Sequence, residues 1–217
     1  MALTDHTPTP VPEPGPGAPT PPIPIQGAGP GAATTRLATP AVEVSEAVIE
    51  RLRGACPDVT VDHADRAEAS RDWWPLAMTW AVDGAVPSMA AVVVRPTDKF
   101  QVPDILRICN DAKVPVTAAA GRSGVCGSSV PLYGGVVLDL CGLEGIVSVD
   151  NDSLVLDVLP GTFGDVLEHE LRNTYNVTCG HWPQSIALST VGGWLACRGA
   201  GQLSTRYGKI EDIVTGL

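Results

Sequence analysis

Buried strands and one amphipathic helix alternate over residues 87–140, and this alternation limits the possible folds more than any other feature. The β-branched run 90–95 predicts a strand, and residues 96–98 open a helix. The apolar positions of that helix are Val102, Ile105, Leu106, Cys109 and Ala112. Residues 114–118 and 135–140 predict two more buried strands, so the segment is expected to form a right-handed βαβ unit with a parallel sheet.

A hairpin and a second helix are expected after this unit. Residues 145–149 and 154–159 alternate in polarity around Asn151-Asp152, which is typical of two antiparallel strands. Pro160-Gly161-Thr162 then leads into a helix, on which Glu168, His169 and Glu170 are interpreted as a solvated face. The expected fold class is therefore α+β, with a small parallel βαβ layer plus a mixed or antiparallel sheet.

Composition divides the chain into three segments. Residues 1–40 contain 11 of the 20 prolines, which predicts a disordered Pro/Gly-rich tail. Residues 41–86 form an N-terminal helical segment, and residues 87–217 carry the alternating pattern. The middle segment also holds a tryptophan cluster that the sequence does not place: Trp73, Trp74 and Trp80.

Charge and cysteine content exclude several classes of function. The 24 acidic and 14 basic residues give a net charge of -10, so nucleic acid and anionic membrane surfaces are poor partners. The longest apolar run, residues 89–94, is too short to span a bilayer, and no secretory signal pattern begins the chain, so we expect a cytoplasmic protein. The six cysteines are scattered singly, which indicates reduced thiols and no metal site.

Residues 118–127, the glycine-rich loop, directly follow a predicted strand. Small residues let a backbone approach a ligand closely, and consecutive N–H groups form an anion-binding concavity. The loop lacks the Gly-Lys-Ser/Thr of a Walker motif, and no helix opens directly after it. Taken alone, it fits a ligand loop and a tightly packed turn equally well. Two later small-residue stretches, 183–194 and 198–201, favour a long, extended ligand.

These stretches, taken in order, resemble the FAD-binding PCMH-type domain of the vanillyl-alcohol-oxidase type, from Pro87 to the chain end. The ordered motifs are Val93-Val94-Arg95-Pro96-Thr97, the loop at 118–124, Gly135-Val136-Val137-Leu138-Asp139-Leu140, Val158-Leu159-Pro160-Gly161, Gly180-His181-Trp182-Pro183-Gln184-Ser185, Ser189-Thr190-Val191-Gly192-Gly193-Trp194 and Arg206-Tyr207-Gly208-Lys209-Ile210-Glu211-Asp212-Ile213-Val214. The last two motifs look most like alkyldihydroxyacetonephosphate synthase. Broader relatives are the 2-hydroxyacid oxidases and dehydrogenases.

The resemblance implies FAD as the cofactor. The amides of residues 118–124 would hold its diphosphate, residues 184–190 would line the flavin, and Ile210 with Glu211 would approach the adenosine. The implied cofactor-binding residues are Ala118, Ala119, Ala120, Gly121, Arg122, Ser123, Gly124, Gln184, Ser185, Ser189, Thr190, Cys197, Arg198, Gly199, Ala200, Ile210 and Glu211.

The sequence departs from the family pattern at three places that bear on how FAD would be bound. Arg122 stands where glycine is common, and its side chain could pair with the diphosphate or point to solvent. Relatives with histidyl-linked flavin read Arg-Ser-Gly-Gly-His, whereas Val125 and Cys126 follow Arg122-Ser123-Gly124 here, so non-covalent FAD is expected. Gln184 replaces an acidic residue of the synthase.

The implied activity is that of a flavoenzyme acting through flavin N5 on an alcohol, a 2-hydroxy acid or an acyl-dihydroxyacetone phosphate. It would be an FAD-dependent oxidoreductase or an alkylglycerone-phosphate synthase-like transferase of ether-lipid synthesis. The sequence identifies no catalytic residue; His181 is a candidate acid or base, and a structural hydrogen-bonding role is the favoured alternative.

The resemblance also implies an FAD domain that is incomplete at its C-terminus, so the isolated chain is expected to be inactive. The expected partners are a small-molecule substrate and either a second copy or a chain that carries the missing half. The alternative function is a non-catalytic fragment that binds nucleotide weakly or needs a partner chain.

Overall fold

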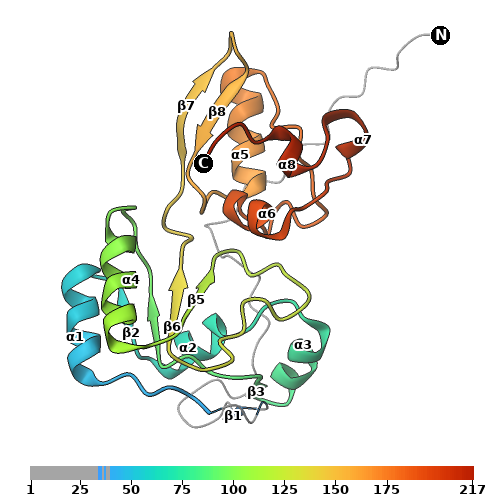
Figure 1. Cartoon of the computed structure of the whole chain (residues 1–217). Helices are drawn as coiled ribbons and strands as arrows, with labels where there is room; N and C mark the ends of the chain where they lie inside the picture. The colour runs from blue at the N-terminus through green and yellow to red at the C-terminus, as the bar shows by residue number, and fades with distance from the viewer. Residues whose placement is uncertain (1–33, 36, 38–39) are drawn as a thin grey trace.

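The computed structural model describes residues 34–35, 37 and 40–217 (Figure 1). The predicted tail therefore lies almost entirely outside the described residues. Two regions follow one another along the chain. We name them the sheet region, which comprises the described residues up to 143, and the hairpin region, residues 144–217.

A four-stranded sheet organises the sheet region. Its order is β2 (Val59–Thr60), β4 (Val92–Val94), β6 (Val136–Asp139) and β5 (Val116–Ala119). The strands β4, β6 and β5 are parallel, as the alternating pattern predicted, and β2 pairs antiparallel with β4. The central strands are buried on both faces, which explains why they read as continuous β-branched runs.

Helices α1 (Glu46–Ala55) and α4 (Gln101–Ala112) cover one face of this sheet. Ile49 and Leu52 of α1 and Ile105 and Cys109 of α4 enter the same core as the strand valines. Leu106, which the sequence placed in the apolar stripe of this helix, is 44% exposed. That assignment was wrong because the buried stripe runs through Ile105 and Cys109, one position to the side.

The other face of the sheet carries smaller residues: Ala69, Ala90, Val93, Ala119 and Val137. Helix α2 (His63–Ala69) approaches this face through Ala69. Helix α3 (Pro75–Val82) and the short parallel pair β1 (Thr34–Thr35) and β3 (Ala85–Val86) complete the region. Small side chains leave room for loop segments to lie close to the sheet.

The hairpin region begins with the predicted hairpin, β7 (Ile146–Asp150) and β8 (Val155–Val158). The helices that follow are α5 (Gly164–Glu170), the π-helix η1 (Leu171–Tyr175), α6 (Val191–Cys197), α7 (Ser204–Tyr207) and α8 (Ile210–Ile213). Leu167, Leu171, Trp194 and Ile210 form their core, and the inner side of the hairpin packs against it. Figure 1 shows this region beyond the ends to which β5 and β6 point.

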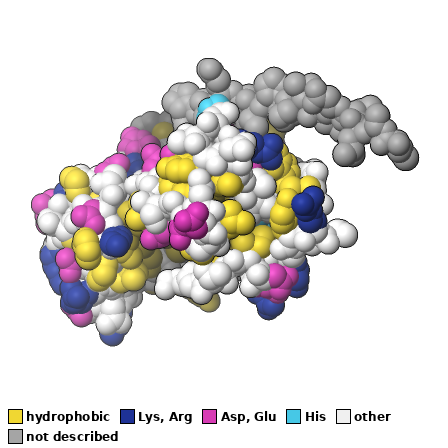
Figure 2. All heavy atoms as spheres, turned by 90° about the horizontal axis from the view of Figure 1, so that it is seen from above, with side chains coloured by type: hydrophobic (Ala, Val, Ile, Leu, Met, Phe, Trp, Pro, Cys, Tyr) yellow, Lys and Arg dark blue, Asp and Glu magenta, His cyan; other side chains and the backbone are white. Residues whose placement is uncertain are grey.

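The described residues were searched for membrane-spanning helices, metal-binding groups and disulfide bonds. No helix among them is long and apolar enough to cross a membrane. They hold no group of three metal-ligating side chains, and all six cysteines are free thiols. Figure 2 shows basic, acidic and apolar side chains mixed on the face seen from above rather than a single basic surface.

Candidate functional site

The carboxyl ends of the parallel strands bring the predicted loop next to charged residues. β5 ends at Ala119 and β6 ends at Asp139, and these two residues are paired in register. The glycine-rich loop leaves β5 at this point without forming a helix, as predicted. Arg95 follows β4 at the same edge. Ligands of open α/β sheets bind at this end of the strands, so this edge is the candidate site.

Arg122 is turned into the protein rather than toward solvent. Its side chain is 5% exposed, and its Nη1 donates to Asp139 Oδ2 at 3.2 Å. Its Nη2 lies 4.0 Å from Glu68 Oε1 on α2. The backbone of Arg122 has a φ of 51°, in the left-handed region that few residues other than glycine adopt. The solvent-facing orientation expected as one alternative is therefore excluded.

Asp139 is the centre of a chain of alternating charges. Its Oδ1 accepts a hydrogen bond from the Cys141 N–H at 3.1 Å, and its Oδ2 lies 4.0 Å from Arg95 Nε. Arg95 in turn pairs with Asp58 at 3.3 Å and with Asp65 at 3.5 Å. The sequence analysis assigned no role to Asp139; a carboxylate at the last position of a buried strand is the signal that points to it.

Gly121 joins the glycine-rich loop to the hairpin region. A Cβ built on Gly121 would overlap the carbonyl oxygen of Leu188. The Cα of Ser189 would lie 3.2 Å from the same Cβ. The predicted diphosphate loop and the predicted flavin-lining stretch are therefore in direct backbone contact, and only glycine fits between them.

The N–H groups of the glycine-rich loop are available to a ligand. Within the described part of the chain, the N–H groups of residues 120–126 donate to no acceptor, while the Gly124 carbonyl accepts from the Trp73 N–H at 2.9 Å. Ala118 is exposed and Ser123 is half-buried. A row of unpaired backbone donors among small residues is able to bind an anion. The residues present therefore fit a diphosphate.

The tryptophan cluster supports the same loop. A Cβ on Gly127 would lie 3.1 Å from Cε3 of Trp74, so the loop packs directly on this indole. Trp74 meets Trp80 edge to face, with ring centroids 5.6 Å apart. Asp72 Oδ1 accepts from the Trp74 N–H at 3.0 Å. The sequence left this cluster unplaced because its contacts lie about fifty residues away.

Ser189 and Thr190 use their hydroxyl groups inside the protein. Ser189 Oγ accepts from the Trp194 indole N–H at 2.7 Å and donates to the Ser185 carbonyl at 2.8 Å. Thr190 Oγ1 accepts from the Gly193 N–H at 3.4 Å and caps α6. Both residues are buried, whereas Gln184 is exposed and Ser185 is half-buried. The two buried hydroxyls therefore hold the local backbone by hydrogen bonds. The exposed surface of residues 183–194 is formed by other residues.

His181 is enclosed and has no hydrogen-bond partner among the described residues. Its side chain is 1% exposed, and neither ring nitrogen has a partner there. The imidazole lies 4.7 Å from the Trp194 ring, and a Cβ on Gly199 would lie 3.5 Å from its Nε2. Burial lowers the pKa of His181, which favours the neutral ring. The hydrogen-bonding role expected for it is thus not seen within the described chain.

Glu168 is a buried anchor that the sequence interpretation missed. The predicted solvated face was wrong for this residue, because its side chain is 0% exposed. It accepts from the Thr178 hydroxyl, the Cys179 N–H and Arg172 Nε, each at 2.9 Å. These bonds fix the segment that leads to His181, named here the histidine loop, residues 178–182.

The residues expected near the adenosine form a surface cluster at the ends of α6 and α8. Arg198 adopts a φ of 52° and donates to Glu211 from Nε at 3.1 Å and from Nη2 at 2.8 Å. Arg198, together with Lys209 at 2.9 Å, lowers the pKa of Glu211 to about 2. Cys197 and Ala200 are exposed, and Ile210 lies in the core.

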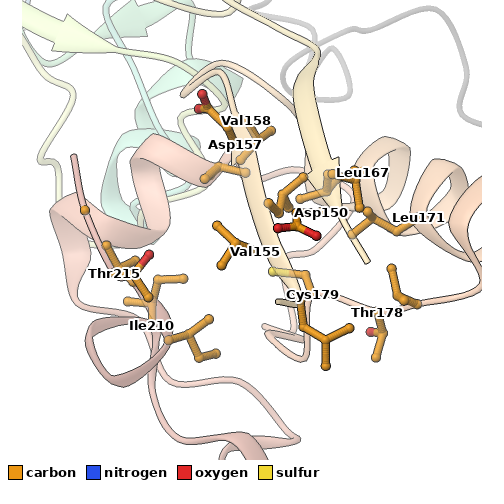
Figure 3. Close-up of a pocket in the computed structure, with 18 of the residues that line it drawn as sticks. Asp150, Val155, Asp157, Val158, Leu167, Leu171, Thr178, Cys179, Ile210 and Thr215 are labelled. Atoms are coloured by element: carbon orange, nitrogen blue, oxygen red, sulfur yellow. The ribbon is translucent and has the colours of Figure 1, made fainter. Parts of the chain in front are cut away.

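A separate apolar cavity of about 480 Å³ lies within the hairpin region. Figure 3 shows Val155, Leu167, Leu171 and Ile210 around it. Of the predicted cofactor-binding residues it contains Ile210 alone. Because the cavity includes so little of the predicted cofactor-binding set, we place the candidate site at the glycine-rich loop.

Several known proteins are similar to this chain in sequence. Residues 90–217 match the model of the family described as FAD binding domain. The chain is 30% identical over 139 residues to alkyldihydroxyacetonephosphate synthase of Caenorhabditis elegans, covering 62% of this chain and 23% of that protein. It is 38% identical over 130 residues to the uncharacterised FAD-linked oxidoreductase YgcU of Escherichia coli (strain K12), covering 58% and 26%.

A solved alkyldihydroxyacetonephosphate synthase structure superposes with a TM-score of 0.74 at 22% identity, covering 83% of this chain and 33% of that one. This likeness confirms the predicted PCMH-type fold class. The chain spans about a quarter of the length of the curated relatives it matches.

Proposed function

The chain belongs to the family of FAD binding domains, and from this premise we propose that it is the FAD-binding portion of a flavoenzyme of the alkyldihydroxyacetonephosphate synthase and FAD-linked oxidase type. The observation that carries the proposal is the glycine-rich loop, whose N–H groups at residues 120–126 are unpaired within the described chain. Its place at the carboxyl ends of β5 and β6 supports a nucleotide cofactor there.

The diphosphate would be bound by neutral backbone donors. Arg122, the one cationic side chain in the loop, is already paired with Asp139. Backbone N–H groups can stabilise an anion without a lysine or arginine, because several partial charges converge on it. This mode of binding suits a chain with a net charge of -10. Cys126 stands where histidyl-linked relatives have histidine, so we propose that FAD is held non-covalently.

The hairpin region would bind the rest of the cofactor. Its backbone at 188–189 touches the loop at Gly121, so the flavin is proposed to lie along residues 184–190. Gln184 is exposed there and Ser185 is half-buried, so both have polar side chains within reach of a ligand. The turn 197–200 and Glu211 with Ile210 are proposed to contact the remaining parts of the cofactor. His181, neutral and enclosed beside Trp194, is the candidate acid or base.

FAD, when bound, supplies the electron-accepting chemistry at flavin N5, and the chain supplies orientation and electrostatics. We propose an alcohol, a 2-hydroxy acid or an acyl-dihydroxyacetone phosphate as substrate class for the whole protein. The first two would make it an oxidoreductase, and the third an alkylglycerone-phosphate synthase-like transferase. A second copy of the chain or a separate chain is the proposed partner.

A titration with flavins tests the proposal. The purified chain is titrated with FAD, with FMN and with riboflavin, and binding is followed by flavin fluorescence and by co-elution of the visible band in gel filtration. We expect FAD to bind more tightly than FMN, because FMN offers a single phosphate to the loop. Clean separation of free FAD from folded protein would contradict the proposal and favour a fragment that needs a partner chain.

The substrate class needs a second measurement on the FAD-loaded protein. Under anaerobic conditions, loss of the visible flavin band on addition of a 2-hydroxy acid or an alcohol would support the oxidoreductase. With a fatty alcohol supplied, replacement of the acyl group of an acyl-dihydroxyacetone phosphate by that alcohol, with release of the fatty acid and no net reduction of the flavin, would support the transferase.

A further inference from the structure

The ion pair between Arg122 and Asp139 has a role that stability alone does not explain. We propose that this pair is a positioning element of the glycine-rich loop. It holds residues 120–126 in the conformation that presents their N–H groups, and it keeps the arginine charge away from the diphosphate. The proposal rests on the proposed function, since it concerns how the loop binds FAD.

The backbone of Arg122 is the first support for this role. Five non-glycine residues of the described chain have positive φ: Lys113, Arg122, Leu154, Asn176 and Arg198. Among these five, Arg122 alone is buried. A left-handed conformation is unfavourable for a residue with a Cβ. It persists where the surroundings fix it, and here the buried side chain provides that fixation.

The partners of Arg122 come from rigid elements. Asp139 ends β6, and its carboxylate is oriented by the Cys141 N–H at 3.1 Å. Glu68 lies on α2, at 4.0 Å from the guanidinium. Because the strand and the helix both belong to the packed sheet region, the position of the guanidinium is set before any ligand binds. The fixed guanidinium in turn restricts the conformation of the loop backbone at Arg122.

The Arg122–Asp139 pair is surrounded by further charged side chains. Arg122 lies between the carboxylates of Asp139 and Glu68, and Asp139 lies between the guanidinium groups of Arg122 and Arg95. Glu68 is held more closely by the buried Arg71, whose Nε donates to it at 3.1 Å, so Arg122 is paired chiefly with Asp139. The attraction left for a diphosphate comes from the backbone N–H groups, so binding of FAD should depend weakly on salt.

One unpaired donor argues against a purely stabilising pair. Arg122 Nε is buried and has no acceptor within the described chain. An unsatisfied buried donor is destabilising, and apolar residues of similar volume often replace a buried ion pair at no cost. An apolar pair of similar volume would therefore stabilise the protein as well as this ion pair does. An apolar pair would not, however, hold the loop in its present conformation.

Three variants separate positioning from stability: Asp139→Asn, Arg122→Met and the double variant Arg122→Met/Asp139→Leu. Unfolding in urea is measured without FAD, and the FAD dissociation constant is measured by fluorescence. We expect both single variants to be destabilised, because each leaves one buried polar partner unpaired. The double variant should regain most of the stability and still bind FAD on the order of tenfold more weakly.

An exposed ion pair provides the matched control. Arg107 and Asp104 pair on the exposed side of α4, and the variant Asp104→Leu/Arg107→Met removes the same two kinds of charge from a helix that is not part of the loop. This variant should bind FAD like the wild type. Equal loss of FAD affinity in the control would overturn the proposal, because removal of any ion pair would then be enough to weaken binding.

The wild-type chain supplies a further measurement that does not depend on the folding of any variant. Its FAD dissociation constant should change less than about twofold between low and high potassium chloride. A steep loss of affinity with salt would overturn the proposal, since it would indicate an arginine on the diphosphate. Wild-type affinity in the double variant would overturn it as well, while leaving the proposed function supported. Absence of FAD binding to the wild type would overturn both.

Discussion

Asp139 in the sheet region and Glu168 in the hairpin region both hold a loop from a buried position, but they do so through different groups. Asp139 reaches the glycine-rich loop through the Arg122 side chain at 3.2 Å. Glu168 accepts directly from the Cys179 N–H of the histidine loop at 2.9 Å. A loop that is held by a side chain keeps its N–H groups for a ligand, whereas a loop held by its backbone uses one of them for its own structure.

The two regions also differ in how their cores are built. The sheet region buries β-branched strand residues between helices, and its loop rests on elements that are fixed by the sheet. The hairpin region packs short helices on two strands, with Val147, Leu154 and Val155 exposed. The hairpin region therefore depends more on single polar anchors, of which Glu168 has the most hydrogen-bond partners. The predictions that follow test this difference, beginning with the largest expected effect.

Replacement of Glu168 tests the direct anchor. Glu168→Ala removes the acceptor of the Thr178 hydroxyl, the Cys179 N–H and Arg172 Nε. We expect the free energy of unfolding in urea to fall by about 3 kcal/mol, because several hydrogen bonds to a fully buried carboxylate are lost together. Glu170→Ala, two positions along at an exposed site, is the control and should change stability by less than about 0.5 kcal/mol. Equal stabilities of the two variants would refute the anchoring role.

Replacement of Gly121 tests the contact between the regions. Gly121→Ala forces the loop and the Leu188 carbonyl apart, and we expect a loss of about 2 kcal/mol in stability together with weakened FAD binding. Gly54→Ala in α1 is the matched control, since a Cβ there meets nothing within 4 Å. The control should be stabilised by roughly 0.5–1 kcal/mol, as is usual for glycine within a helix. Unchanged FAD affinity in Gly121→Ala would show that the contact does not govern the site.

Much of the fold could be predicted from the sequence because its signals are local. The β-branched runs gave the strands β4, β5 and β6, and the alternation around Asn151-Asp152 gave the hairpin. The order of the motifs gave the PCMH-type fold class, which the solved relatives confirm. The π-helix η1 was not predicted, since its residues continue the helical pattern of α5.

The anchors of the site could not be predicted, because their partners are distant in the sequence. Arg122 and Asp139 are 17 residues apart, and sequence alone left the direction of the arginine open. Trp74 supports the loop at Gly127 across more than fifty residues. Glu168 looked like a surface residue because its neighbours are polar, and its burial follows from the return of the chain at residues 178–179. The assigned roles of the cofactor-binding residues stay predictions.

Ser189 and Trp194 test a neutral anchor of the hairpin region. Ser189→Ala leaves the buried Trp194 indole N–H without its acceptor at 2.7 Å, and we expect a loss of about 1–2 kcal/mol in the free energy of unfolding. A double-mutant cycle with Trp194→Phe isolates the hydrogen bond, because phenylalanine has no N–H to leave unpaired. The coupling free energy should be about 1 kcal/mol. Strict additivity of the two substitutions would mean that this bond does not hold the stretch 185–194.

The smallest expected effect concerns the titration of His181. Burial lowers the pKa of this histidine below its usual value of 6.5. As the pH falls below 6.5, the unfolded chain therefore takes up the proton more readily than the folded chain, and stability is lost; above 6.5 both states are neutral and the contribution vanishes. His181→Phe should retain more of its stability on acidification than the wild type does. Urea unfolding of both proteins between neutral and mildly acidic pH measures the difference, and parallel curves would show that the enclosed ring does not titrate with folding. A difference between the two proteins would mean that burial alone makes His181 contribute to the pH dependence of stability in the hairpin region. At the glycine-rich loop, by contrast, the charged side chains of Arg122 and Asp139 are paired with each other.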